Sequence, residues 1–419
     1  MKSLPVLSSN TQLGIQQQLR KLYKKIVDYS GVIPDLRFNN TSYQGLRNYL
    51  DPIHRKCEKV EFGVGSYTHG VTAVIYGYHG NVYNPTQNRI YFVPYLQGDN
   101  VNWHYIDCNT GEVVAYTHGV SVEDGGYNGG VYSPTQNRIY FVPHAQGPEL
   151  QWHYIDCNTG EVVAYTHGVS VKLSGYNGGV YSPTQNRIYF VPYSQAPESQ
   201  WHYIDCNTGD VVAYTHGVTA VNYAYVGGVY SLTQNRIYLV PFTQSDQQYW
   251  HYIDCDTGEV VAYSHVVVSG TGYAGGVYSP IQNRIYFVPQ NSEAQWHYID
   301  CNTGEVGSYT HGASVVGIYA YAGGAYSPAQ NRIYFVPYGQ SNQEYWHYID
   351  CNTGEVIPYK NRVTVEAYGY FGSVYSSTEN RIYFTPYSQG PESEWHYIQD
   401  YSDVKVSRSL MSGALFNKL

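Results

Sequence analysis

Short runs of β-branched and aromatic residues, separated by turn-forming residues, fill the chain from about residue 63 to residue 399. In one copy of the pattern the runs are 130–133, 138–142, 152–156 and 162–166. Such runs are typical of strands, and the Gly, Pro, Asn and Ser residues between them are typical of turns. The second run is apolar on both faces, so the sheet it belongs to must be covered on both sides.

This unit of four strands is repeated seven times. Trp-His-Tyr and Asn-Arg-Ile-Tyr each occur seven times, and successive tryptophans are 46 to 50 residues apart. A period of about 40–50 residues that contains several strands is typical of a propeller blade. We therefore predict an all-β fold, a seven-bladed β-propeller of four-stranded antiparallel blades in which neighbouring blades cover one another.

The two ends of the repeat array complement each other. Residues 64–70 match the fourth strand of a unit but precede any first strand, whereas the last unit lacks its fourth strand after Ile398. We predict that a strand at 60–69 pairs with the last blade beside 394–399, which closes the ring and removes free sheet edges. The predicted propeller is thus 57–400, followed by a C-terminal tail at 401–419.

Residues 1–56 lie outside the repeat and form a predicted helical N-terminal extension. Apolar residues at Ile15, Leu19, Leu22 and Ile26 give one stripe of a helix within residues 11–29. Two roles for this helix are open: docking on the propeller, or oligomerisation and partner binding.

The repeat resembles the YVTN/PQQ-like class of β-propeller repeats. The residues that carry the resemblance are Gly-Val-Tyr-Ser-Pro at 130–134, Ile-Tyr-Phe-Val at 139–142 and Ile-Asp-Cys-Asn-Thr-Gly-Glu-Val-Val at 155–163. The near-identical copies and the richness in Asn and Tyr also resemble repeat proteins of giant amoeba-infecting DNA viruses (Mimiviridae-like). These resemblances imply a propeller fold and a viral protein, and they leave the activity open because propellers host many functions.

Charge and hydropathy exclude several classes of function. Residues 1–60 carry 10 Lys/Arg and 4 Asp/Glu, while the remaining residues carry 13 and 28. An acidic propeller argues against nucleic acid as its ligand. No run of 18 apolar residues occurs, so no membrane span is expected, and residues 1–10 lack the apolar run of a signal peptide. We expect a cytoplasmic location, which for a viral protein is the host cytoplasm or the virion.

Residues that often carry chemistry recur once or twice in each unit. Six of the seven cysteines follow Ile-Asp, one in each of six units, and the seventh is Cys57. The cysteines are expected to be free structural thiols, and the histidines to pack and to brace turns, because equivalent positions diverge around a ring and do not converge on one metal ion. Arg138 and Asp156 are expected to lie at the same end of their blade. We find no unique acid–base pair, nucleophile elbow or phosphate loop, so we predict no enzyme activity, no metal and no cofactor.

Two sets of residues are candidate binding sites. Tyrosines that precede the first strands are predicted to ring one mouth of the central channel and to bind a ligand there, although wedging between blades is the alternative: Tyr78, Tyr127, Tyr176, Tyr225, Tyr273, Tyr321 and Tyr370. Residues that differ between copies gather in the loops of one face: Tyr76, Glu123, Asp124, Lys172, Tyr223 and Glu366.

The predicted function is a non-enzymatic interaction or structural propeller that binds a protein partner through this variable loop face. The first alternative is a lectin-like propeller that binds a glycan. The second alternative is an enzyme of the lactonase or quinoprotein kind.

Overall fold

The computed structural model describes residues 63–243, 247–265, 272–290, 295–312, 319–340 and 343–399. All of them belong to Gly63–Leu419, one of the two units into which the chain divides. The predicted N-terminal extension, its helix at 11–29 and the tail at 401–419 lie outside the described residues, as does Cys57.

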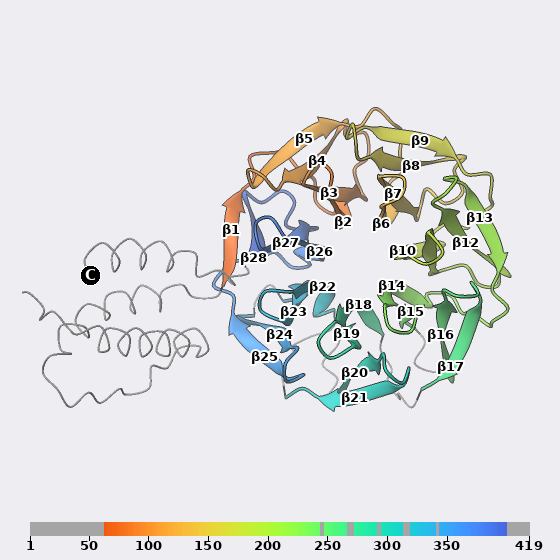
Figure 1. Ribbon diagram of the computed structural model, residues 1–419. Coiled ribbons are helices and arrows are strands. Elements are labelled where there is room, and N and C mark those ends of the chain that lie inside the picture. Colours follow the sequence, from red (N-terminus) through yellow and green to blue (C-terminus); the bar gives the residue numbers. More distant parts are fainter. Residues whose placement is uncertain are drawn as a thin grey trace, which may run out of the picture. The chain divides into compact units, whose positions relative to one another are not determined.

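Seven sheets of four antiparallel strands form a closed ring (Figure 1), as the repeat predicted. The first strand of each blade lies nearest the central axis and the fourth lies at the rim. The described residues contain no helix.

The strands of the first four blades, from the axis outward, have the following bounds. Blade 1 is β2 (Tyr78–Asn84), β3 (Arg89–Pro94), β4 (Asn102–Asp107) and β5 (Glu112–Thr117). Blade 2 is β6 (Tyr127–Ser133), β7 (Arg138–Pro143), β8 (Gln151–Asp156) and β9 (Val162–Thr166). Blade 3 is β10 (Tyr176–Ser182), β11 (Arg187–Pro192), β12 (Gln200–Asp205) and β13 (Val211–Thr215). Blade 4 is β14 (Tyr225–Ser231), β15 (Arg236–Pro241), β16 (Tyr249–Asp254) and β17 (Val260–Ser264).

The remaining blades follow the same order, and the last one takes its outer strand from the start of the described chain. Blade 5 is β18 (Tyr273–Ser279), β19 (Arg284–Pro289), β20 (Gln295–Asp300) and β21 (Val306–Thr310). Blade 6 is β22 (Tyr321–Ser327), β23 (Arg332–Pro337), β24 (Tyr345–Asp350) and β25 (Val356–Lys360). Blade 7 is β26 (Tyr370–Ser376), β27 (Arg381–Pro386), β28 (Glu394–Gln399) and β1 (Val64–Thr68).

Strand β1 closes the ring. It pairs antiparallel with β28, with Val64 opposite Ile398 and Tyr67 opposite Trp395. This is the place at which the sequence put the outer strand of the seventh blade. Strands β1 and β28 come from opposite ends of the array, and their pairing completes the seventh sheet. The seventh blade then lies beside the first, so every blade in the ring has two neighbours.

The hydrophobic core is a set of layers between successive blades. One layer joins Tyr91 and Trp103 of blade 1 to Tyr127, Phe141 and other residues of blade 2, and comparable clusters fill other gaps. All seven tryptophans are almost fully buried. Each blade therefore buries its two apolar faces against its neighbours. This was predicted from the apolar residues on both faces of the second strand.

Each layer also contains a buried polar pair. The hydroxyl of Tyr127 and Nδ1 of His153 are 2.5 Å apart, and the equivalent Tyr–His pair occurs in all seven blades. Burial lowers the pKa of the histidine to about 4 in every blade. These histidines are therefore neutral at pH 7.

The inner strands approach one another closely at one glycine in six of the seven blades. A Cβ atom built on Gly129, which has φ of 86°, would lie 3.3 Å from Cα of Gly178 in the next blade. The backbone has a bulge here, since the pairing of β6 with β7 shifts between Tyr127 and Gly130. Glycine is required because this position combines a left-handed backbone with a near contact between chains.

Arginines bind the face of a tyrosine in every blade. The guanidinium of Arg138 lies 4.3 Å from the ring centre of Tyr154, and the other six blades repeat this contact. Arg138 also stands opposite Asp156 in the strand register, so the predicted placement at one blade end is confirmed. The cation–π contact was not predicted.

The turns between first and second strands link neighbouring blades. Oγ1 of Thr86 donates to Oδ1 of Asn137 in the next blade at 2.7 Å, and the same link follows Thr135, Thr184, Thr233 and Thr378. The equivalent positions in blades 5 and 6 are Ile281 and Ala329. These side chains cannot donate, so this hydrogen bond is missing at two of the seven junctions.

Restoring this link should stabilise the ring. We expect Ile281→Thr and Ala329→Thr each to raise the free energy of unfolding by about 1 kcal/mol, the usual net value of a hydrogen bond. Little apolar burial is lost, because Ile281 is 65% exposed. Denaturant unfolding measures the change, and Thr86→Val is the matched control that should destabilise by a similar amount. A destabilised Ile281→Thr protein would contradict the assignment.

The Tyr–His pairs predict acid sensitivity. Histidines with an ordinary pKa of 6.5 in the unfolded chain and about 4 in the folded chain leave stability unchanged above pH 6.5. Stability then falls as the pH drops from 6.5 towards 4, because the unfolded state binds more protons. Melting temperatures measured from pH 7 to pH 4.5 should show uptake of several protons on unfolding.

A double variant isolates one pair. Tyr127→Phe combined with His153→Phe removes both polar groups and should reduce the proton uptake at pH 5 by about one. An unchanged slope of stability against pH would show that His153 does not cause the effect.

Candidate functional site: an aromatic collar on the variable face

The seven tyrosines predicted to ring the channel mouth do not do so. Tyr78, Tyr127, Tyr176, Tyr225, Tyr273, Tyr321 and Tyr370 are at most 5% exposed. Each ring lies in a layer between blades, where its hydroxyl pairs with the histidine described above. These side chains therefore cannot contact a ligand in the channel. The prediction is wrong because the apolar space between adjacent blades takes up the ring, which was the alternative placement.

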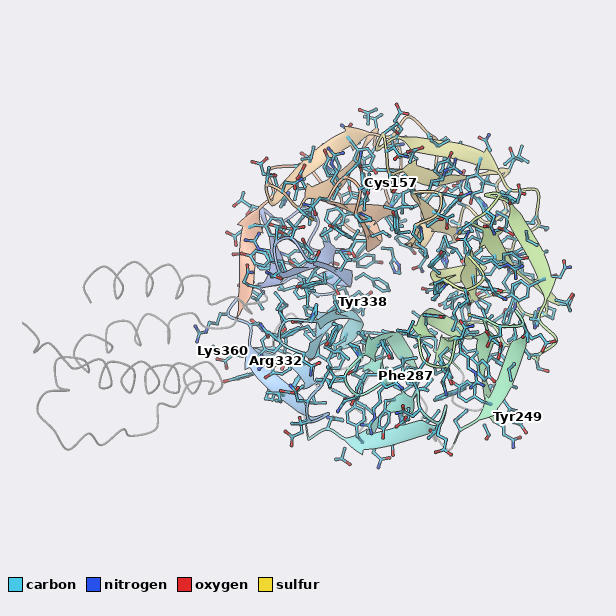
Figure 2. All side chains as sticks on the ribbon, viewed as in Figure 1. Cys157, Tyr249, Phe287, Arg332, Tyr338 and Lys360 are labelled. Carbon is cyan, nitrogen blue, oxygen red and sulfur yellow. The ribbon has the colours of Figure 1, made fainter. Side chains whose placement is uncertain are left out.

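A different position supplies the aromatic ring. The residue that follows the proline ending each second strand contacts its counterpart in the next blade at five of the seven junctions. We call these residues the aromatic collar: Tyr95, His144, Tyr193, Phe242, Gln290, Tyr338 and Tyr387. Six of the seven are aromatic, and all are partly exposed. Tyr338 lies beside the central opening in Figure 2.

The collar side chains contact one another around most of the ring. Ring centres are 6.4 Å apart for Tyr95 and His144, 6.1 Å for His144 and Tyr193, and 6.0 Å for Tyr193 and Phe242. Tyr387 lies 6.3 Å from Tyr95 and 6.0 Å from Tyr338. Gln290 interrupts the aromatic series between Phe242 and Tyr338.

Four further tyrosines line the collar from the crossovers between blades. Tyr76, Tyr223, Tyr319 and Tyr368 have φ angles of 58° to 63°. We call them the left-handed tyrosines. The ring of Tyr76 lies 4.7 Å from Tyr387, that of Tyr223 lies 5.1 Å from Tyr193, and that of Tyr368 lies 4.9 Å from Tyr338.

The left-handed backbone of these tyrosines is strained. A bulky residue at positive φ costs about 1–2 kcal/mol, and such strain tends to collect at functional sites. The equivalent residues in blades 2 and 3 are Gly125 and Ser174, which have φ of 72° and 55°. Glycine thus fits this position in the same protein, so tyrosine is not needed for the backbone to fold.

The collar is electrically neutral. Burial, with a smaller contribution from the neighbouring phenols of Tyr368, Tyr76, Tyr319 and Tyr95, raises the pKa of Tyr338 to about 12. The same causes raise the pKa of Tyr387. The hydroxyls therefore keep their protons at pH 7, and the collar offers apolar ring faces together with neutral hydrogen-bonding groups.

The predicted variable loops surround the collar. The backbone N–H of Gly125 donates to the carbonyl of Tyr95 at 2.8 Å, which places the crossover and the loop after the second strand on the same face. Of the six residues predicted there, Tyr76 and Tyr223 are left-handed tyrosines.

The other four variable residues brace the loops. Asp124 Oδ1 accepts from Gly98 N at 2.8 Å, and Lys172 forms an ion pair of 2.9 Å with Glu198. The backbone N–H of Glu123 and that of Glu366 each donate to a glutamine side chain at 2.9 Å. The structure therefore brings all six residues to one face, which we call the variable face.

The repeated thiols and outer histidines have structural contacts. Cys108, Cys157, Cys206, Cys255, Cys301 and Cys351 are buried and free, as predicted. Outer-strand histidines stack on tryptophans, as His118 does on Trp103 with ring centres 4.0 Å apart, and His118 Nε2 bonds the carbonyl of Asn100 at 2.6 Å. Within the described ranges, no three His, Cys, Asp or Glu side chains cluster as metal ligands would, and no helix could span a membrane.

Replacing the left-handed tyrosines by glycine should relieve strain. We expect Tyr223→Gly and Tyr368→Gly to leave the free energy of unfolding within about 1 kcal/mol of the parent, because the relief at positive φ offsets the lost ring contact. Tyr154→Gly, within a strand, is the control that should destabilise strongly. A loss of more than about 2 kcal/mol in Tyr223→Gly, measured by denaturant unfolding, would contradict the strain assignment.

Comparison with known proteins supports the fold and leaves the activity open. No protein family model matches the chain, and no curated protein matches it. Among solved structures it is similar to hydrazine synthase of Kuenenia stuttgartiensis, with a TM-score of 0.55 and 14% identity over 80% of this chain and 100% of that one. It is also similar to a chain of the mitotic checkpoint complex, with a TM-score of 0.54 and 8% identity over 81% and 93% of the two chains.

A third similar structure is the extracellular domain of a hybrid two-component system protein from B. thetaiotaomicron. Here the TM-score is 0.53 and the identity 8%, over 81% of this chain and 40% of that chain. At such identities the likeness concerns the fold alone. The chain is a seven-bladed β-propeller.

Proposed function

We propose that this chain is a non-enzymatic interaction propeller that binds a protein partner through the variable face, with the aromatic collar at the centre of the contact. The observation that carries the proposal is the collar together with its left-handed tyrosines. Partly exposed tyrosines in a strained backbone are not required by the fold, since blades 2 and 3 do without them. Tyrosine is also enriched among the residues that contribute most to binding at protein interfaces.

The location of the positions that vary between the seven repeats also supports binding through the variable face. The contacts repeated in every blade, such as arginine on tyrosine and tyrosine with histidine, hold strands and layers together. The positions that differ between copies gather on the variable face, around the collar. An interaction surface needs such local differences, whereas the ring needs repetition.

The repeat motifs support a finer assignment. We propose a repeat of the YVTN/PQQ-like type and an origin in a giant DNA virus, with the protein in the host cytoplasm or the virion. The sequence features that support it are the Ile-Asp-x-x-Thr-Gly hairpin and the near-identical Asn- and Tyr-rich copies.

A glycan is the second candidate ligand. The collar supports it because partly exposed tyrosines combine apolar faces, on which sugar rings pack, with hydroxyls that bond them. A glycan array with the parent and with a variant that replaces Tyr193 and Tyr338 by Gln distinguishes the two candidates, since a glycan bound by the collar gives a saturable signal that this variant loses.

Substitution of collar tyrosines by glutamine tests their role in binding, because the collar already contains a glutamine in blade 5. Gln290 occupies a collar position in blade 5, so Tyr193→Gln with Tyr338→Gln should keep the melting temperature within a few degrees. We expect the pair to weaken partner binding at least tenfold, which corresponds to about 1.4 kcal/mol. The measurement is quantitative affinity capture from the native source, followed by titration of the captured protein.

A variant on the opposite face is the control. Ile281→Thr changes a turn between first and second strands and should bind the partner like the parent. Unchanged capture by the glutamine pair would refute the proposed interface.

A further inference from the structure

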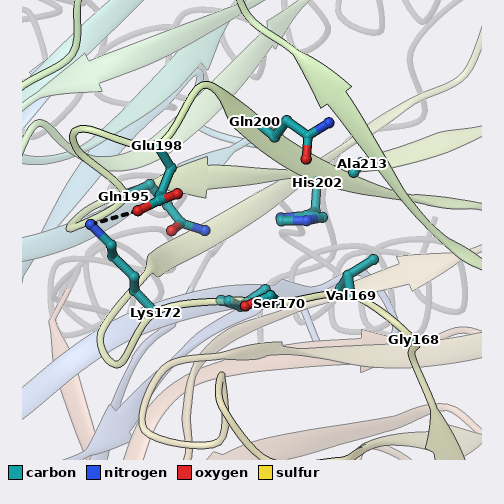
Figure 3. Close-up of a pocket in the computed structure, with 10 residues that line it drawn as sticks. Gly168, Val169, Ser170, Lys172, Gln195, Glu198, Gln200, His202 and Ala213 are labelled. Carbon is teal, nitrogen blue, oxygen red and sulfur yellow. Dashed lines mark ion pairs between the residues drawn. The ribbon is translucent and has the colours of Figure 1, made fainter.

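Blade 3 contains a cavity next to the variable face. The cavity has a volume of about 540 Å³. It lies between the crossover 168–172 and the loop that precedes β12 (Figure 3). Its lining includes Val169, Ser170, Lys172, Gln195, Gln200 and His202.

The same loop is built differently in blades 2 and 7, whose sequences are almost the same. Residues 145–149 are Ala-Gln-Gly-Pro-Glu and 388–392 are Ser-Gln-Gly-Pro-Glu, whereas 194–198 are Ser-Gln-Ala-Pro-Glu. In blade 2 the Gln146 amide joins the loop to the crossover: Oε1 accepts from Glu123 N at 2.9 Å and Nε2 donates to the carbonyl of Gln151 at 3.0 Å. Trp152 Nε1 donates to the carbonyl of Gln146 at 2.9 Å.

Blade 7 repeats these three bonds. Gln389 accepts from Glu366 N at 2.9 Å and donates to the carbonyl of Glu394 at 3.1 Å, and Trp395 donates to the carbonyl of Gln389 at 3.0 Å. The glutamine therefore fills the space between the crossover and the loop in both blades.

Blade 3 makes none of these bonds. Gln195 is 2% exposed, and neither its Nε2 nor its Oε1 has a partner at hydrogen-bonding geometry among the described residues. Trp201 Nε1 is likewise buried without an acceptor there. The amide of Gln195 thus borders the cavity and does not bridge it.

The methyl group of Ala196 explains the difference. A Cβ atom at Gly147 would lie 2.7 Å from the carbonyl oxygen of Lys172, and one at Gly390 would lie 2.4 Å from that of Val74. The blade 2 and blade 7 loop conformation therefore has no room for a side chain at this position. Ala196 occupies it in blade 3, so the loop moves away from the position that lets the glutamine bridge.

The lining is polar but carries little net charge. His202 Nδ1 pairs with the Tyr176 hydroxyl at 2.5 Å. With Nδ1 accepting that hydrogen bond, Nε2 carries the hydrogen and can donate into the cavity. Ser170 and two glutamine amides add donors and acceptors. The charges of Lys172 and Glu198 are paired at 2.9 Å (Figure 3).

We infer that this cavity binds a neutral polyhydroxylated ligand, such as a single sugar residue, and that Ala196 opens the site in blade 3. The hydroxyls of such a ligand would form hydrogen bonds with the buried amide of Gln195, the imidazole of His202 and the Ser170 hydroxyl. Without such partners, burial of these polar groups costs free energy. A charged ligand would have to displace the Lys172–Glu198 pair. The site is separate from the collar, so it does not depend on the protein partner.

The test compares the parent with Ala196→Gly, the residue found in blades 2 and 7. Saturation-transfer NMR with the methyl glycosides of glucose, galactose, mannose and N-acetylglucosamine should give a signal for at least one of them with the parent. Ala196→Gly should lose that signal and keep its melting temperature. Gln195→Leu, which removes only the amide, should weaken binding at least tenfold.

Hydrogen exchange tests the opening without any ligand. In Ala196→Gly the backbone N–H of Lys172 and the indole N–H of Trp201 should become more protected from exchange. The side-chain oxygen of Gln195 would accept from the Lys172 N–H, and the backbone carbonyl of Gln195 would accept from the Trp201 indole, as the equivalent groups do in blade 2. Silence of all four glycosides, stronger binding of glucuronate, equal binding by Ala196→Gly, or unchanged exchange in that variant would each overturn the inference.

Discussion

The structure depends on burial of aromatic surface between neighbouring blades. A single blade has two apolar faces and cannot cover either one, as the fully buried tryptophans of all seven blades show. The favourable energy therefore arises at junctions between blades, at about 25 cal/mol per Å² of apolar surface removed from water. A linear array would leave two end faces exposed. Ring closure through β1 and β28 removes both, which is why one strand comes from the opposite end of the array.

In each layer one tyrosine hydroxyl and one histidine are satisfied as a pair. The hydroxyl of Tyr127 meets His153, and Arg138 lies on Tyr154. A buried polar group without a partner destabilises a fold, so the two members of each pair must be kept together. This requirement accounts for the constancy of Tyr, His and Arg in all seven units better than a catalytic role would, since catalysis needs one distinct constellation.

The repeat made the fold predictable, while the site followed from it only in part. Strand order, blade number and the place of the outermost strand of blade 7 are all consequences of spacing and turn residues. The tyrosines before the first strands were misplaced because sequence does not state which side of a bulged strand faces the axis and which faces the next blade. The collar position had a signal that was overlooked: an invariant proline is followed by Tyr, His, Tyr, Phe, Gln, Tyr and Tyr. The crowding at Gly147 and Gly390 could not be foreseen, because a Cβ atom at either position would meet a carbonyl of the next crossover, which only the folded ring brings near.

Gln290 gives the collar a property that a perfect ring lacks. Seven equivalent aromatic positions would receive a protruding segment in seven rotations of equal energy, and the complex would have no defined orientation. One amide among six aromatic side chains makes those rotations unequal, and so does the presence of a left-handed tyrosine in only four of the seven blades. A molecule bound by the collar as proposed would therefore have one preferred orientation about the axis of the ring.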